Sequence, residues 1–263
     1  MSHNFTIQLP KFIAHRGASN VAPENTLAAM YEAFMMEASY FETDLKLTSC
    51  GELILFHDDT LERTTNGHGK VKDWSLEDLK QLDAGSWFSP EFKDEKIPTF
   101  KELIAFLQHH EMLANLELKP CQGRERQTAE TFVEMYHQFW PDDFMPPIVS
   151  SYSFECIQII QKHLPLLPRA IILDELNSEP DWLNTFKELD CYALHCCETL
   201  VPTYEHFQKL VQKVDHLCVF TVNDPLTAQK LIDWGVTSIF TDNHDVLSWS
   251  CYWDKEKEYK LCV

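Results

Sequence analysis

The sequence lacks several features that would assign it to other classes of protein. Its nine cysteines include no CxxC pair, and the count is odd, so neither a disulfide framework nor a zinc site is indicated. There is no run of about 18 apolar residues, which a membrane-spanning helix would need. Residues 1–10 lack the basic start and the apolar stretch of a signal peptide. We therefore expect a cytoplasmic protein without membrane insertion.

Basic residues are also scarce. The chain has 22 Lys and Arg against 41 Asp and Glu, which gives a formal net charge of −19. A field of this sign repels polyanions, so we expect neither nucleic acid nor an anionic membrane surface as a partner. An anionic small-molecule substrate would need local positive charge, which a bound cation, Arg16 and Lys119 could supply.

The chain does show a regular alternation of short apolar runs and helical stretches. Eight β-rich runs are each followed by a helix candidate, an order typical of a (β/α)8 TIM barrel in the α/β class. With no linker or repeat, we expect one domain over residues 1–263. The runs are residues 12–15, 40–44, 113–118, 148–151, 170–173, 192–194, 217–222 and 238–241.

The helix after the first run is marked most clearly. Asn25 is a good N-cap residue, and Leu27, Met30, Tyr31 and Phe34 follow at helical spacing. The pattern therefore predicts a helix that begins at an Asn25 cap.

One segment interrupts the alternation after the second barrel strand. Residues 49–52 are predicted to form a turn and residues 53–56 a strand that runs back, which would place His57 over the barrel mouth. The following residues are mostly polar, and about 40 of them are too many for an ordinary βα loop. We expect a small inserted subdomain at about residues 59–98 that caps the site.

Acidic side chains lie at the ends of two predicted barrel strands. Glu42 and Asp44 are two positions apart, so both leave the same face, which at the C-terminal end of a barrel strand is the active-site mouth. Glu117 and Lys119 repeat this arrangement on the next barrel strand. Three carboxylates without a cysteine or an HxH pair favour Mg²⁺ or Ca²⁺ over zinc. The missing HxH pair also argues against a metal-dependent amidohydrolase.

Two histidines are candidates for proton transfer. His15 ends the first run, and His57 follows the returning strand. Because an imidazole titrates near working pH, one could remove a proton from an attacking oxygen and the other could protonate a leaving alcohol. The sequence does not assign the two roles. Asp58 could orient His57, or it could belong to a turn at the edge of the hairpin.

The remaining polar candidates concern the phosphate. Arg16 offers a planar fork suited to phosphate oxygens, and Lys119 supplies a point charge. Glu24 could anchor Arg16, and Asn223 could donate to the substrate from the end of the seventh run. Loop capping and turn formation are the alternative interpretation for Glu24 and Asn223.

Several further residues are predicted to be structural. His195 is interpreted as a hydrogen-bonded core residue outside the site, and Asp242 as a helix N-cap. Aromatic residues could line a pocket for a choline or ethanolamine group, although packing of the inserted segment is the favoured interpretation. These aromatic residues are Trp87, Phe88, Tyr152 and Phe220.

The order of the motifs resembles the glycerophosphodiester phosphodiesterase family, especially its short, cytosolic bacterial type. The resemblance implies the same barrel and insertion, metal ligation by Glu42, Asp44 and Glu117, and acid/base roles for the two histidines. Phe220 stands where the family usually has Trp, and Tyr152 stands where it usually has Phe. These two differences would change the shape of the pocket. The motifs are His15-Arg16-Gly17, Pro23-Glu24-Asn25-Thr26, Glu42-Thr43-Asp44, His57-Asp58, Glu117-Leu118-Lys119, Ser150-Ser151-Tyr152, Pro168-Arg169, Leu173-Asp174-Glu175, Thr221-Val222-Asn223, Gly235 and Thr241-Asp242.

The sequence thus predicts metal-dependent hydrolysis of glycerophosphodiesters to glycerol 3-phosphate and an alcohol. Cleavage of the lysophospholipase D type would need an apolar channel through the inserted segment, which is mostly polar. A non-catalytic phosphodiester-binding barrel would be expected to lack a histidine or a metal carboxylate, and none is missing. The leaving alcohol, the choice between Mg²⁺ and Ca²⁺, and the presence of a homodimer stay open.

Overall fold

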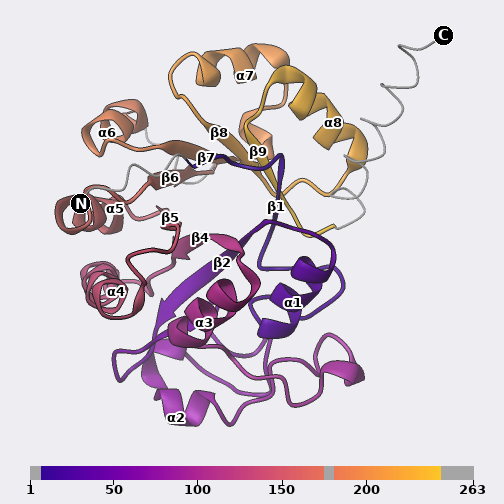
Figure 1. Cartoon of the computed structure of the whole chain (residues 1–263), viewed down its shortest axis with the longest axis vertical. Helices are drawn as coiled ribbons and strands as arrows, with labels where there is room; N and C mark the ends of the chain where they lie inside the picture. Colours follow the sequence, from indigo (N-terminus) through magenta and orange to yellow (C-terminus); the bar gives the residue numbers. More distant parts are fainter. Residues whose placement is uncertain (1–6, 175–180, 244–263) are drawn as a thin grey trace.

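A computed structural model of the chain describes residues 7–174 and 181–243. Eight parallel strands form a barrel that closes where β1 pairs with both β9 and β2, so the predicted TIM barrel is confirmed (Figure 1). Glu175, which belongs to one of the sequence motifs, lies outside the described residues. The barrel strands are β1 (Phe12–Ala14), β2 (Tyr40–Leu47), β4 (Leu113–Leu118), β5 (Ile148–Ser151), β6 (Arg169–Leu173), β7 (Ala193–Cys197), β8 (Leu217–Phe220) and β9 (Ser238–Thr241).

Helices surround the barrel on its outer face (Figure 1). Most of them begin at a residue whose side chain caps the helix. Helix α3, for example, begins with a capping box in which Thr99 and Glu102 exchange hydrogen bonds. A short turn of 3-10 helix, η3 (Glu198–Leu200), follows β7. The helices are α1 (Leu27–Met35), α3 (Phe100–His110), α4 (Glu125–Phe139), α5 (Phe154–His163), α6 (Trp182–Glu188), α7 (Tyr204–Val211) and α8 (Pro225–Trp234).

The predicted N-cap of α1 is wrong by one residue. Thr26 caps the helix, because its hydroxyl accepts from the backbone N–H of Ala29. Asn25 has a positive φ of 56° and faces the barrel instead. Its side-chain oxygen accepts from the Thr43 hydroxyl at 2.7 Å and from the backbone N–H of Asp44 at 3.1 Å. Asn25 therefore fixes β2 and does not start the helix.

A buried cluster closes the barrel below the site. Its members come from seven different strands and still contact one another, so they fill the interior of the barrel. Most lie near the starts of their strands, which leaves the C-terminal ends open for a site. The cluster contains Ile13, Tyr40, Ile148, Ala170, Ala193, Cys218 and Phe240.

The hairpin after β2 forms as predicted. Strand β3 (Leu53–Leu55) pairs antiparallel with the end of β2, with Leu45 opposite Leu55. Between β3 and α3 the chain forms η1 (Val71–Asp73), α2 (Leu76–Leu79) and η2 (Pro90–Phe92). This segment lies beside α1 and α3 (Figure 1) and has an apolar cluster of its own, built from Ile54, Phe56, Leu61, Val71, Leu79, Ala84 and Ile97.

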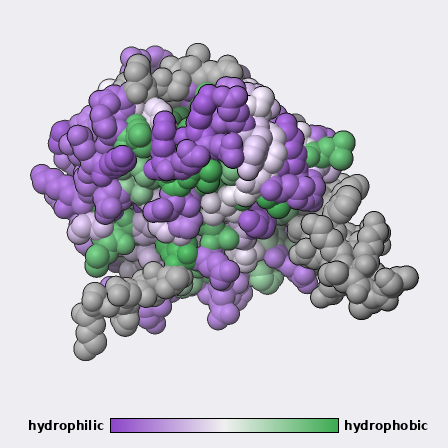
Figure 2. Space-filling view, turned by 90° about the horizontal axis from the view of Figure 1, so that it is seen from above, coloured by the Kyte–Doolittle hydropathy of each residue, from purple (hydrophilic) through white to green (hydrophobic). Residues whose placement is uncertain are grey.

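The outer surface over α7 and α8 is mostly hydrophilic. Seen from above the view of Figure 1, hydrophobic residues there form separate patches and no continuous apolar face (Figure 2). Leu226 on α8 is an exposed hydrophobic residue. Across the described ranges, every helix is too short or too polar to cross a membrane.

Candidate active site

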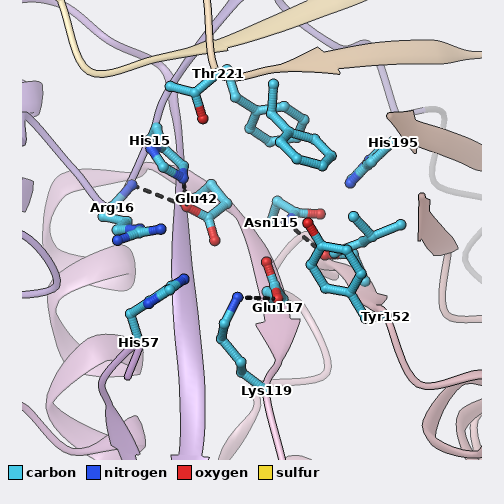
Figure 3. A pocket seen from close by; sticks show the side chains of 14 residues that line it. His15, Arg16, Glu42, His57, Asn115, Glu117, Lys119, Tyr152, His195 and Thr221 are labelled. Atoms are coloured by element: carbon cyan, nitrogen blue, oxygen red, sulfur yellow. Dashed lines mark hydrogen bonds and ion pairs between the residues drawn. The ribbon is translucent and has the colours of Figure 1, made fainter. Parts of the chain in front are cut away.

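A cavity of about 230 Å³ opens at the C-terminal ends of the barrel strands. Asp44 lies directly beneath its surface and is only 1% exposed. Figure 3 shows that the side chains converge from different strands and from the hairpin. Six of the residues predicted for the site line the cavity: His15, Arg16, Glu42, His57, Glu117 and Lys119.

Three carboxylates form a cluster at the centre of the cavity. Because Asp44 on β2 is in register with Glu117 on β4, the strand pairing places both beside Glu42. One oxygen of each of the three lies within 4.8 Å of the others. Oε2 of Glu42 accepts from the backbone N–H of Arg16 at 3.0 Å, whereas Oε1 is buried and has no hydrogen-bond partner within residues 7–174 and 181–243. An unpartnered buried oxygen beside two more carboxylates fits a hard cation.

The charges in this cluster are strongly perturbed. Burial and the neighbouring carboxylates of Asp44 and Glu117 raise the pKa of Glu42 well above its usual range. Burial also raises the pKa of Glu117, although Lys119 opposes the shift. Burial also acts to raise the pKa of Asp44, but the positive charges of Lys119 and Arg16 outweigh it and hold this pKa below the usual range. Like charges in a buried cluster of this kind require a counter-charge to ionise together.

Arg16 and Lys119 supply the positive charge of the site. Nη1 of Arg16 donates to Glu24 at 2.7 Å, and its Nε lies 3.4 Å from Oδ2 of Asp44. Glu24 thus lies where it anchors the guanidinium. Lys119 donates to Glu117 at 2.9 Å and lies over the Tyr152 ring, 5.3 Å from its centroid. Both cations border the carboxylate cluster and face the cavity.

Each candidate histidine is paired with a carboxylate through Nδ1. His57 Nδ1 lies 2.6 Å from Oδ1 of Asp58, and His15 Nδ1 lies 2.6 Å from Oδ1 of Asp242. Such a pair favours the tautomer with the proton on Nδ1 and leaves Nε2 for the reacting groups. Burial lowers the pKa of His57, and Arg16 acts in the same direction. The shift favours the neutral imidazole, the form that can accept a proton.

Asp242 and Asn223 are joined by hydrogen bonds. Oδ1 of Asp242 accepts from Ser19 Oγ at 2.9 Å, and Oδ2 accepts from Asn223 Nδ2 at 2.8 Å. Asn223 is absent from the cavity lining, and its side chain positions Asp242 instead of facing the cavity. A helix starting at Asp242 would lie in residues 244 onward, outside the described residues. Its carboxylate contacts the imidazole of His15 at Nδ1 and thereby holds the ring in place.

Arg63, which was not predicted from the sequence, forms hydrogen bonds with both Asp58 and Glu24. Its Nε and Nη2 donate to the two oxygens of Asp58 at 2.7 and 2.8 Å. Its Nη1 and Nη2 donate to the two oxygens of Glu24 at 2.6 and 2.9 Å. Arg63 holds the pKa of Asp58 below its usual range through these hydrogen bonds. One guanidinium thereby fixes the partners of both His57 and Arg16.

The aromatic candidates divide into two groups. Tyr152 and Phe220 line the cavity and meet edge to face, with their ring centroids 6.4 Å apart. Trp87 and Phe88 do not line it; Trp87 packs on Phe88, and Phe88 packs on Phe92, in the segment between β3 and α3. Packing of that segment, the favoured interpretation, therefore holds for the second pair only.

His195, predicted to be a core residue outside the site, is buried but borders the cavity. The structure places its imidazole in the cavity wall, where it is 2% exposed. Asn115 and Ser150 also line the cavity and were not predicted. Asn115 precedes Glu117 by two positions on β4, so strand alternation could have indicated that both face the barrel interior.

Hydrolysis of a phosphoric diester requires positive charge on the non-bridging oxygens and groups that move protons to and from the reacting oxygens. The cavity provides both within one barrel mouth. By its fold and its site, the protein is a TIM-barrel phosphodiesterase.

Comparison with known proteins identifies the family. Residues 15–246 match the model of the glycerophosphoryl diester phosphodiesterase family, and the chain belongs to this family. It is 32% identical over 250 residues to a glycerophosphodiester phosphodiesterase of Bacillus subtilis, covering 89% of this chain and 84% of that one. A glycerophosphodiester phosphodiesterase from Caldanaerobacter subterraneus is 32% identical over 242 residues, covering 89% of this chain and 95% of that one. Among solved structures, an Oleispira antarctica phosphodiesterase in complex with the product sn-glycerol-3-phosphate is 36% identical, with a TM-score of 0.85 and coverage of 91% and 96%.

Proposed function

We propose that this protein hydrolyses glycerophosphodiesters to sn-glycerol 3-phosphate and an alcohol. The observation that carries the proposal is the carboxylate cluster of Glu42, Asp44 and Glu117 flanked by Arg16 and Lys119. The product bound to the Oleispira antarctica phosphodiesterase supports the same substrate class.

The proposal includes one divalent cation, Mg²⁺ or Ca²⁺, held by the three carboxylates. The unpartnered Oε1 of Glu42 and the close approach of the ligand oxygens support it. When bound, the cation would supply positive charge to the phosphate oxygens. Glu42, Asp44 and Glu117 would each contribute an oxygen, the ligand type that both ions prefer.

Arg16 and Lys119 bind the phosphate in this proposal. The guanidinium is held by Glu24 and Asp44, so its remaining N–H groups are fixed in direction before the substrate arrives. Lys119, anchored on Glu117, adds a point charge from the neighbouring strand. Preorganised donors of this kind stabilise the charge that develops on the phosphate oxygens, and they do so without reorganisation.

His15 and His57 divide the proton transfers. One imidazole takes a proton at Nε2 from the attacking oxygen, and the other gives a proton from Nε2 to the oxygen of the leaving alcohol. Over the cycle one water is consumed, and one phosphorus–oxygen bond forms as another breaks. Asp242 and Asp58 stabilise whichever imidazole becomes positive, because each accepts from Nδ1 at 2.6 Å.

We also propose a cytoplasmic location with a small-molecule substrate and no nucleic-acid partner. The seven cysteines in residues 7–174 and 181–243 are free thiols, in keeping with a reducing compartment. The net charge of −19 disfavours polyanionic partners. A homodimer stays a prediction, as does the assignment of residues 1–263 to one domain with an insertion at 59–98.

The experiment that tests the function is an assay of glycerol 3-phosphate release with Mg²⁺ or Ca²⁺. Substrates would be glycerophosphocholine, glycerophosphoethanolamine, glycerophosphoglycerol and a lysophospholipid. We expect turnover of the first three and loss of activity in excess chelator. Comparable or faster turnover of the lysophospholipid would replace the proposed substrate class with that of a lysophospholipase D-type enzyme. Full activity in chelator would remove the cation from the mechanism.

A further inference from the structure

Lys46 is a buried charged residue that the proposed chemistry does not use. It lies on β2 at the same spacing as Glu42 and Asp44, so the three side chains leave the same face of the strand. Its side chain is 1% exposed, and the residue is absent from the lining of the cavity. A buried ammonium group needs a partner of opposite charge, so the place of that partner indicates what Lys46 does.

The carboxylate that pairs with Lys46 is a chain neighbour of the active-site residues His57 and Asp58. Nζ of Lys46 donates to Oδ1 of Asp59 at 2.7 Å, and Asp59 is its ion-pair partner in the described part of the chain. Asp59 directly follows Asp58, which contacts Nδ1 of His57 at 2.6 Å. Partial burial acts to raise the pKa of Asp59, but the hydrogen bond from Lys46 outweighs it and holds this pKa below the usual range. The shift favours the ionised carboxylate and hence the ion pair.

The short segment that carries His57 into the cavity (Figure 3) is held on β2 at both ends. Before it, the backbone N–H of Phe56 donates to the carbonyl oxygen of Asp44 at 3.0 Å. After it, the side chain of Asp59 accepts from Lys46, two positions further along the same strand. The first anchor is a backbone hydrogen bond, whereas the second joins two side chains. A single substitution can therefore release the second end from β2.

The ion pair adds little to the stability of the fold. Replacing a buried ion pair by apolar side chains is often neutral or stabilising, because the desolvation of the charges is avoided. The side chain of Asp59 is 59% exposed, so without Lys46 its carboxylate could turn to water. The backbone oxygen of Asp59 accepts from the N–H of Val71 in η1, so the released end would follow the inserted segment and no longer β2. The effect of the pair is thus on geometry.

We propose that Lys46 is a positioning residue for His57, an assignment that rests on the proposed function. Through Asp59 it holds the His57 segment against β2, the strand that also provides Glu42 and Asp44. The distance between the imidazole and the proposed cation site is then set by one strand. Reaction rates depend steeply on such distances, and a displacement of about 1 Å can cost roughly 100-fold.

Kinetics of single and double variants with glycerophosphocholine test this assignment. Lys46→Met removes the charge and keeps an unbranched side chain of similar length, and Asp59→Ala removes the other half of the pair. Lys46→Met is also combined with His57→Ala. The matched control is Lys80→Met, because Lys80 forms the same kind of ion pair, with Glu102 at 2.5 Å, and neither residue lines the cavity.

We expect Lys46→Met to lower kcat about 10- to 100-fold with little change in KM, because the phosphate-binding residues are untouched. Its thermal midpoint should not fall. Asp59→Ala should lower kcat similarly but should also lower the midpoint, because it leaves a buried charge unpaired. In the His57→Ala background, Lys46→Met should change kcat by less than about twofold, since the side chain that it positions is gone. A kcat for Lys46→Met equal to that of Lys80→Met, or a loss that multiplies with that of His57→Ala, would overturn the assignment.

Hydrogen exchange separates this assignment from the function on which it rests. The backbone amides of Phe56 and Leu61 are hydrogen-bonded on either side of His57. Exchange of residues 56–61, followed by mass spectrometry, should be faster in Lys46→Met than in the wild type and in Lys80→Met. Unchanged exchange would show that Lys46 does not anchor the segment. Faster exchange in a protein whose wild type releases no glycerol 3-phosphate would refute the proposed function and leave the anchor in place.

Discussion

His15 and His57 occupy matching environments, yet they reach the cavity from different segments. Each has a carboxylate at 2.6 Å from Nδ1, so the local geometry does not distinguish acid from base. The chemistry of the leaving group can separate the two roles, because a choline oxygen must be protonated as it leaves and a nitrophenolate need not be.

We predict that alanine replacement of the histidine that acts as acid is severe with glycerophosphocholine and much milder with a nitrophenyl phosphodiester. Replacement of the other histidine should be severe with both substrates. Each proton transfer contributes roughly 10²–10⁴-fold in rate, so the difference is easily measured from kcat/KM. Arg16→Ala is the control, since it should depress both substrates alike. Identical losses for His15→Ala and His57→Ala on both substrates would rule out divided roles.

The three carboxylates are predicted to hold the cation jointly. Glu42→Gln, Asp44→Asn and Glu117→Gln should each weaken cation affinity, because each change removes one charged oxygen ligand. Saturating cation should stabilise the wild-type protein by about 2.7 kcal/mol at 100 times its Kd. Thermal midpoints measured with and without each cation check this. Glu134→Gln on α4, where the side chain is exposed, should respond as the wild type does. A thermal midpoint of the wild type that is the same with and without each cation would argue against a cation site at these residues.

Arg63 provides a further prediction for a single residue. Arg63→Met should lower kcat for glycerophosphocholine by about 10- to 100-fold, because it releases both Asp58 and Glu24; groups that orient active-site residues typically have effects of this size. Arg63→Lys should recover little, since an ammonium group cannot form both bidentate pairs. Arg126→Met is the control, because Arg126 pairs with Glu155 on the exposed surface. If Arg63→Met and Arg126→Met have equal kcat values, the bridge has no role in catalysis.

At the scale of elements, the sequence predicted the positions of the strands more reliably than the N-cap residues of the helices. The barrel strands are short, largely apolar runs, as expected for buried parallel strands. Asn25 was misassigned because Asn is a good N-cap in isolation, whereas its side chain here bonds to β2, a contact between segments that no local pattern contains. The same reason explains why the contact of Asp242 with His15 and that of Arg63 with Glu24 were not predicted: the partners lie 227 and 39 residues away.

The junction between β1 and α1 gives a prediction about an element. Gly17 has a φ of +79°, and a Cβ there would lie 2.8 Å from the backbone carbon of Ala29 in α1. Gly51 also has a positive φ, +85°, but a Cβ there would meet nothing within 4 Å. Gly51→Ala should therefore cost about 1–2 kcal/mol from backbone strain alone. Gly17→Ala should cost about 1–3 kcal/mol more, because α1 must also move.

Denaturant unfolding of the two glycine variants measures this difference. Gly17→Ala should also lower kcat/KM, since the displaced junction carries Arg16, whereas Gly51→Ala should retain activity. Equal losses of stability would mean that α1 accommodates the methyl group freely.

For the whole molecule, burial of His195 predicts a pH dependence of stability. The pKa is lowered by burial from 6.5 to about 3, so the folded state binds the proton less readily than the unfolded state does. With respect to this group, the free energy of unfolding is at its maximum above pH 6.5. It falls as the pH drops from 6.5 toward 3, because the unfolded state then binds the proton and the folded state does not. At pH 4.5 the loss is on the order of 2–3 kcal/mol.

Unfolding free energies of the wild type and His195→Phe at pH 7 and pH 4.5 test this prediction. The variant should lose less stability on acidification, because it has no buried imidazole to protonate. His163→Gln, which changes an exposed histidine, should behave as the wild type does. Parallel curves for the wild type and His195→Phe would show that another group controls the acid response.

The closure of the barrel has a consequence for the making of the protein. His15 directly follows the first barrel strand, and the carboxylate that fixes it, Asp242, follows the last one, 227 positions later. A nascent chain on the ribosome can therefore present His57, Lys119 and all three carboxylates while one of its two imidazoles still lacks its partner. Any chain terminated before β9 should be inactive even though every residue proposed to bind the phosphate has been synthesised. Catalysis thus reports that translation has passed Asp242.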